Sequence, residues 1–234
     1  MALSEASYED LISKQPSFVR IELEQVGKKF QRGQHSGNLG LGEWIFRGIT
    51  LTFQQQQSYA FTGPNGSGKS TLLLILAGLL PPSKGKIHYY QKEKPVDEET
   101  IFRHISMSAP YMELIEEFTL EEFLSFHTTL KPFKPGVTAN QLLERTGLTA
   151  ARQKYIYQFS SGMKQRLKLG ISFYSQSPVL LLDEPCSNLD QQGIQWYQEE
   201  IKQHIAEKLV IICSNQSFEY DFCDQIIDIT QFKR

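Results

Sequence analysis

A glycine-rich run near residue 65 carries the side chains best suited to chemistry. It contains the spacing G-x-x-x-x-G-K-[ST] of a phosphate-binding P-loop (Walker A motif), and its members are Gly63, Pro64, Asn65, Gly66, Ser67, Gly68, Lys69, Ser70 and Thr71. Glycines let the backbone approach phosphate oxygens closely and aim successive N–H groups at them. We expect Lys69 to reach the β- and γ-phosphates and the Ser70 hydroxyl to ligate Mg²⁺. The run therefore predicts a site for a nucleoside triphosphate.

The residues on either side of this run fit the elements that a P-loop needs. An apolar, β-prone stretch over 58–62 precedes it, and an apolar stretch over 72–77 that is typical of a buried helix follows it. A helix that begins directly after the loop favours anions at its N-terminus through its dipole. The alternative, a glycine-rich turn without a ligand, does not explain this strand–loop–helix order.

Two adjacent carboxylates follow a second apolar run. Val179 to Leu182 predicts a buried strand, and Asp183, Glu184 and Pro185 come directly after it. Open α/β sheets bind ligands at the carboxyl ends of their strands. We therefore expect Asp183 in the Mg²⁺ shell beside the P-loop serine, and Glu184 to orient or deprotonate an attacking water. The alternative is that both carboxylates only cap the next turn, which the upstream P-loop argues against.

The order of apolar runs predicts the scaffold around these residues. Strand-like segments lie at 18–26, 44–53, 58–62, 84–90, 101–107, 179–182, 209–213 and 225–229. Helical patches fill 118–157, and further helices are expected from residue 161 and over 190–207. Apolar strands separated by helices predict an α/β fold with a parallel sheet covered on both faces.

Bulk composition excludes several classes of protein. A chain of 234 residues with a net charge of -2 has room for a large core and no general attraction for nucleic acid, which we do not expect as a partner. The apolar stretch over 72–80 is too short to cross a bilayer, and residues 1–18 lack the pattern of a secretory signal. Cys186, Cys213 and Cys223 lack C-x-x-C spacing, which favours reduced thiols in a cytosolic protein.

A third motif lies between the P-loop and the two carboxylates. The segment from Phe159 to Arg166 has Ser160 or Ser161 to cap a helix, and Gly162 leaves the first turn bare of side chains. Such a helix end is a second anion site, although the segment alone would favour an ordinary capped helix. With its P-loop, helical insert, Ser-Gly signature and Asp-Glu-Pro in this order, the chain resembles the ATP-binding cassette (ABC) family over roughly residues 18–230.

The resemblance implies a particular fold and division of the chain. It implies a P-loop NTPase with a mostly parallel sheet core flanked by helices, an N-terminal antiparallel β portion and an α-helical insert subdomain. We expect one ABC ATPase domain over 1–234, with an ATP-binding core formed by 18–110 and 158–230 and the α-helical subdomain at 111–157.

It also implies how the nucleotide is held. In the family, the signature of one subunit, here Ser160, Ser161 and Gly162, meets the γ-phosphate bound by the P-loop of the other, so that two subunits sandwich each ATP. Residues 187–190 resemble the D-loop, which assigns Asp190 to the nucleotide site. ATP rather than GTP is likewise implied by the resemblance alone.

An aromatic side chain after the first strand stacks on the adenine in this family. Phe30 holds that position, and Trp44 is the alternate. Stacking requires only the face of a π-system, so either ring suits the role. Simple core packing is the competing interpretation of Phe30.

Two positions depart from the family pattern in ways that bear on the rate of hydrolysis. Asn215 stands where a histidine would contact the γ-phosphate, and an amide cannot carry a charge or relay a proton. Losing one charged donor typically costs roughly 10²–10³ in rate, so we expect slow hydrolysis, with Glu184 retained. Pro110 stands where the Q-loop glutamine is expected, and Glu113 is a possible substitute.

The signature itself departs from the common Leu-Ser-Gly-Gly-Gln. Ser161 and Met163 give Ser-Ser-Gly-Met, which is similar to the cassettes of ABC-2-type exporters. These changes leave open a pairing with a different cassette in which this chain contributes one degenerate site.

The resemblance implies the ATP-binding and hydrolysing subunit of an ABC membrane transporter. We expect a second ABC ATPase subunit, identical or not, and a separate integral-membrane permease that docks around residues 111–118 and places the chain on the inner, cytoplasmic face of the cell membrane. One alternative is a degenerate ATP-sensing cassette, which Asn215 and Pro110 favour and Glu184 opposes. Another is a soluble, non-transport ABC ATPase, which the acidic balance and the lack of a coiled-coil insert oppose.

Overall fold

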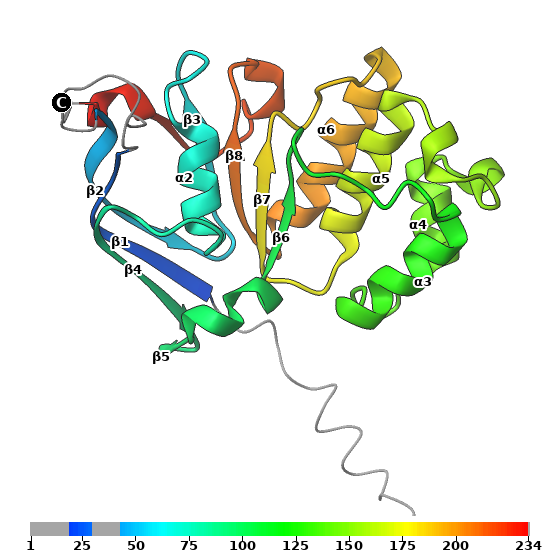
Figure 1. Ribbon diagram of the computed structural model, residues 1–234, viewed down its shortest axis with the longest axis horizontal. Helices are drawn as coiled ribbons and strands as arrows, with labels where there is room; N and C mark the ends of the chain where they lie inside the picture. The colour runs from blue at the N-terminus through cyan, green and yellow to red at the C-terminus, as the bar shows by residue number, and fades with distance from the viewer. Residues whose placement is uncertain (1–18, 30–42, 234) are drawn as a thin grey trace, which may run out of the picture.

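Residues 19–29 and 43–233 are described by the structure, a computed structural model drawn in Figure 1. The strands are β1 (Val19–Lys29), β2 (Trp44–Gln54), β3 (Ser58–Thr62), β4 (Lys84–Gln91), β5 (Lys94–Pro95), β6 (Ile105–Ser108), β7 (Val179–Asp183), β8 (Leu209–Cys213) and β9 (Gln225–Asp228). The α-helices are α2 (Lys69–Leu76), α3 (Leu120–Leu130), α4 (Ala139–Thr146), α5 (Ser161–Tyr174) and α6 (Gln191–Ile205). None of the helices in these described ranges combines the length and the hydropathy of a membrane span.

The strands form two sheets with different directions of pairing. The described residues give a four-stranded antiparallel sheet in the order β2-β1-β4-β5 and a five-stranded parallel sheet in the order β6-β7-β8-β3-β9. The expected fold class, a mostly parallel core with helices and an N-terminal antiparallel portion, is therefore confirmed.

Both faces of the parallel sheet are buried, each in its own hydrophobic cluster. Leu181 of β7 packs with α2 and the antiparallel sheet, whereas its neighbours Leu180 and Leu182 pack with α5 and α6. Figure 1 shows this arrangement, with α2 on one side of the sheet and the two longer helices on the other. The continuous apolar runs in β7 and β8 follow from this double coverage.

The segment before β6 differs from the expectation of a strand over 101–107. Residues Glu98–Arg103 form a 3₁₀ helix, and the strand begins only at Ile105. Asp97 explains the difference, because its side chain accepts a hydrogen bond from the Glu99 N–H at 3.0 Å and caps the turn. Local capping therefore outweighs the β-prone side chains here.

Two short α-helices lie within residues 111–157, where the sequence predicts a helical insert. Each begins with a capping box, formed by Thr119 and Glu122 at α3 and by Thr138 and Gln141 at α4. Local sequence therefore marks the start of both helices, and at α3 the N–H groups of Leu120 and Glu121 also donate to the carbonyls of Lys154 and Arg152. Whether 111–157 behaves as a subdomain of its own stays a prediction.

His127 on α3 sits within an aromatic stack of this helical region. Its ring lies 6.5 Å from that of Phe123 and 5.7 Å from that of Phe133, and its Nε2 lies 3.1 Å from the Ser175 hydroxyl. Burial, followed by the positive charge of Lys131, lowers the pKa of His127 to about 4. The ring is therefore neutral in the folded protein at pH 7.

We predict that His127 makes the protein lose stability in mild acid. Because its folded pKa is below its unfolded value, the contribution is complete above about pH 6.5 and is lost as the pH falls toward 4. The loss between pH 7 and pH 5 should be about 2 kcal/mol. Urea unfolding at both pH values should show a smaller drop for His127→Phe than for the wild type. The exposed His88→Phe control should keep the wild-type drop, and equal drops in all three proteins would refute the assignment.

Candidate functional site

The P-loop joins β3 to α2 and leaves the first turn of that helix without a side-chain cap. Gly68 is the N-cap residue with φ of 105°, and no side chain caps it. A Cβ at this position would lie 2.4 Å from Cγ2 of Ile45 in β2, so the close approach requires glycine. The first N–H groups of α2 therefore point into the loop, where an anion would be held.

Lys69 folds back over this loop. Its Nζ donates hydrogen bonds to the carbonyl oxygens of Gly63 at 2.7 Å and Pro64 at 3.4 Å. The Oγ of Ser67 is buried nearby in the same loop and lacks a hydrogen-bond partner among the described residues. A cation and an unpaired hydroxyl in one loop fit an anionic group with several oxygens.

Ser70 and Asp183 meet between α2 and the end of β7. The Ser70 hydroxyl donates a hydrogen bond to the Asp183 carboxylate, which is 2% exposed. Burial raises the pKa of Asp183, while the Ser70 hydrogen bond and the charge of Lys69 act in the opposite direction. One hydroxyl beside one buried carboxylate suits Mg²⁺, which is usually bound by few protein ligands together with water and phosphate.

Glu184 follows Asp183 but faces a different space. Its φ of 44° lies in the left-handed region, and its N–H donates to the Cys213 carbonyl at 2.8 Å. Its side chain lines a cavity of about 450 Å³ that Asp183 does not line. The lining residues are Asn65, Glu184, Cys186, Ser187, Ser214, Asn215, Gln216, Phe218 and Glu219. The two carboxylates therefore serve separate positions, one at the P-loop helix and one at the cavity.

Asn215 closes the cavity against the P-loop. Its Nδ2 donates a hydrogen bond of 2.8 Å to Oδ1 of Asn65, although the two residues are far apart in the chain. The structure thus brings Asn65, Glu184 and Asn215 around one space, where an amide, a carboxylate and the P-loop face the same volume.

The signature segment begins α5 and packs against the loop that follows Glu184. Ser160, rather than Ser161, is the cap: its Oγ accepts a hydrogen bond from the Met163 N–H at 3.2 Å. A Cβ at Gly162 would lie 3.1 Å from the Asn188 carbonyl oxygen, so glycine keeps these segments close. Ser160 and Ser161 are exposed at this helix end, which belongs to the opposite face of the sheet from α2 (Figure 1).

Asp190 caps α6 and also contacts α5. Its carboxylate accepts a hydrogen bond from the Gly193 N–H at 2.8 Å and lies 3.6 Å from Nη2 of Arg166. Within the chain its interactions are therefore those of a helix cap, and its role at a nucleotide stays a prediction.

Of the two aromatic residues expected at the adenine, the structure describes only Trp44. Phe30 lies outside the described residues. Trp44, the alternate, is half-buried at the start of β2, and Lys29 Nζ lies 5.5 Å from the centre of its ring. Its neighbour Ile45 approaches Gly68, so this end of β2 is close to the P-loop.

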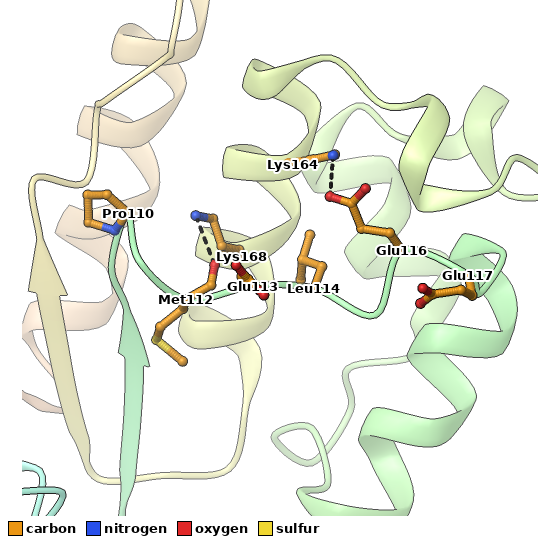
Figure 2. A pocket seen from close by; sticks show the side chains of 8 residues that line it. All are labelled: Pro110, Met112, Glu113, Leu114, Glu116, Glu117, Lys164 and Lys168. Atoms are coloured by element: carbon orange, nitrogen blue, oxygen red, sulfur yellow. Dashed lines mark hydrogen bonds and ion pairs between the residues drawn. The ribbon is translucent and has the colours of Figure 1, made fainter.

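Tyr111 begins the loop over 111–118 that the sequence predicts to face a permease, and it is 48% exposed. Partial desolvation of the phenol, followed by the negative charge of Asp183, raises the pKa of Tyr111. Pro110 instead lines a cleft beside α5 (Figure 2). The parallel pairing of β6 with β7, with Ser108 opposite Leu182, brings the loop that carries Tyr111 to the edge where β7 ends, and no local pattern in the sequence predicts that pairing.

Comparison with known proteins agrees with this geometry. Residues 46–187 match the family model described as ABC transporter. The retinal-specific phospholipid-transporting ATPase ABCA4 of Mus musculus is 29% identical over 187 residues, which cover 78% of this chain and 8% of that protein. The chain thus spans a small part of the length of such relatives.

Solved structures share the fold. A putative ABC transporter ATP-binding protein from Pyrococcus furiosus aligns with a TM-score of 0.73 at 21% identity, covering 91% of this chain and 98% of that one. A dimeric post-hydrolysis state of an ATP-binding cassette, bound to ADP and Pi, aligns with a TM-score of 0.74 at 19% identity, covering 90% and 95%. With more than half of its length matched by the family model and its fold shared by these cassettes, the chain belongs to the ABC transporter family.

Proposed function

We propose that this chain binds and hydrolyses ATP as a subunit of an ABC membrane transporter, and that it energises a separate permease by ATP-driven dimerisation. The observation that carries the proposal is the meeting of the P-loop, Asp183, Glu184 and Asn215 at one edge of the parallel sheet. The related cassette with ADP and Pi supports ATP as the nucleotide.

Ser70 and Asp183 would hold Mg²⁺ in this scheme. The buried carboxylate and its hydroxyl partner, beside a P-loop with an unpaired Ser67 hydroxyl, fit a metal bound to phosphate. The metal, when bound, neutralises charge on the phosphate oxygens. Lys69 would move from the loop carbonyls that it now contacts to the phosphates, which offer it stronger, charge-assisted hydrogen bonds.

Glu184 and Asn215 would act on the water and the γ-phosphate. Glu184 accepts a hydrogen bond from the attacking water and orients or deprotonates it, since its side chain lines the cavity next to the P-loop. Asn215 donates an uncharged hydrogen bond, and its amide already contacts Asn65. We therefore propose slow turnover, with a nucleotide-sensing role, which Asn215 and Pro110 favour, as the second candidate.

A second subunit would complete each nucleotide site. The Ser160–Gly162 end of α5 is capped but bare, and it packs with the opposite sheet face from α2. We propose that it serves the P-loop of a partner cassette, as the dimeric arrangement of the related structure supports.

The permease would dock on the cleft between α5 and the loop that follows β6 (Figure 2). The cleft has a volume of about 540 Å³ and is lined by Pro110, Met112, Glu113, Leu114, Glu116, Glu117, Lys164 and Lys168. Lys164 pairs with Glu116 at 2.5 Å, and Lys168 Nζ lies 3.4 Å from the Met112 carbonyl. Apolar side chains among acidic ones suit a short amphipathic segment of the permease, and such docking would place the chain peripherally on the inner face of the cell membrane.

Nucleotide binding should depend on Lys69. In equilibrium dialysis with magnesium and ATP, Lys69→Ala should bind ATP at least about tenfold more weakly than the wild type, because one charge-assisted contact is lost. Lys86→Ala, at an exposed lysine of β4, is the matched control and should bind like the wild type. Equal affinity of all three proteins would remove the basis of the proposal.

Hydrolysis should be slow and should require Glu184. We expect the purified chain to turn over below the enzyme median of about 10 s⁻¹, and Glu184→Gln to lower this rate by about 10²-fold or more while ATP still binds. Phosphate release under saturating ATP measures both. Equal inactivity of wild type and variant, with binding intact, would favour the sensor over the enzyme.

Membrane association should depend on the cleft. Ile115 lies between the cleft-lining residues Leu114 and Glu116 and is 37% exposed. Ile226 on β9 does not line the cleft and is 56% exposed. Ile115→Asp should lower the share of the chain that sediments with membranes of the native host by about tenfold, because a charge enters an apolar contact. Ile226→Asp should leave that share unchanged. Equal sedimentation of both variants would exclude this docking surface.

A further inference from the structure

Glu219 places a carboxylate between the two loops that carry Glu184 and Asn215. It lies at the end of a short 3₁₀ turn over Ser217–Glu219 and is 2% exposed. Neither the P-loop, the Asp-Glu pair nor the signature includes it.

Each oxygen of this carboxylate binds a different loop. Oε1 accepts a hydrogen bond from the Cys186 N–H at 2.6 Å, and Cys186 follows Glu184 by two positions. Oε2 accepts a hydrogen bond from the Ser214 hydroxyl, and Ser214 directly precedes Asn215. One side chain therefore bridges the loop after β7 to the loop after β8.

The backbone around Glu219 is fixed from the other side by α6. The buried Tyr197 hydroxyl donates to the Glu219 carbonyl at 2.8 Å, and Gln198 Nε2 donates to the Phe218 carbonyl at 3.0 Å. The Ser214 hydroxyl also accepts from the Gln216 N–H at 2.9 Å, which closes the second loop on itself. The bridge therefore rests on a helix of the core rather than on a surface turn.

A carboxylate at this depth is unfavourable unless its hydrogen bonds compensate. Burial raises the pKa of Glu219, and the hydrogen bonds from Ser214 and Cys186 oppose that effect. Burying this carboxylate costs stability, and its two oxygens accept hydrogen bonds that fix the positions of two loops. The residues that gain from that geometry line the cavity beside the P-loop.

We infer that Glu219 is a positioning residue for ATP hydrolysis, which holds the Glu184 loop and the Asn215 loop at a fixed separation across the cavity. The inference rests on the proposed function for its kinetic consequence, but the bridge itself is a property of the protein without nucleotide. Without this bridge, the two loops would move independently. Glu184 and Asn215 would then face the proposed γ-phosphate site together for only part of the time.

Glu219→Gln and Ser214→Ala test the bridge, with Asp221→Asn as the matched control on an exposed carboxyl of the same loop. Hydrogen exchange of the full chain without nucleotide should accelerate about tenfold over both 184–190 and 214–219 in Glu219→Gln. Ser214→Ala should also accelerate 184–190, a segment that it reaches through Glu219. The double variant should add little to either single change, because both break one bridge.

Kinetics separate positioning from general loss of structure. Glu219→Gln should lower kcat by about 10–100-fold while KM for ATP changes less than about threefold. Loosening of one loop alone, of neither loop, or a rise in KM at unchanged kcat would overturn the inference. If the wild type hydrolyses no ATP, the proposed function fails, and the exchange data still decide whether the bridge exists.

Discussion

Parallel pairing of β7 with β8 and of β8 with β3 is the constraint on which the site depends. Phe61 of β3 and Asp183 of β7 both pair with Cys213 of β8, so the three strands reach the same level of the sheet. The chain then leaves each strand at a common edge, which is where ligands bind in open α/β sheets. The P-loop, Glu184 and Asn215 are neighbours because of that pairing. Side-chain contacts such as the hydrogen bond from Asn215 to Asn65 form within this arrangement.

The polar groups at this edge are held at a cost to stability. Asp183 and Glu219 are both 2% exposed, and burial raises the pKa of each. Apolar residues of similar size would be the more stable choice at such positions. The proposed binding of phosphate and metal at this edge would require prearranged charge, and the two large apolar clusters supply stability that offsets this cost.

Local sequence predicts the parts of the site that are contiguous in the chain. The strand–loop–helix around Lys69 and the buried strand before Asp183 follow from spacing and apolar runs, and the structure has both. Such patterns do not predict contacts between segments that are far apart in the chain. The hydrogen bond from Cys186 to Glu219 depends on how two loops meet after the sheet has formed, and the position of Tyr111 depends on the pairing of β6. The prediction that the strand begins at residue 101 was wrong, because the cap at Asp97 starts a 3₁₀ helix before β6.

The alternation of Leu180, Leu181 and Leu182 between the two clusters limits how this molecule can move. A shift of β7 by one residue would move each of its side chains to the opposite face of the sheet, and the packing of both clusters would be lost. A slide of β7 along its neighbours β6 and β8 is therefore unfavourable. Any rearrangement of the described residues that keeps both clusters packed therefore leaves the register of β7 unchanged and is confined to the loops that connect the strands to the helices.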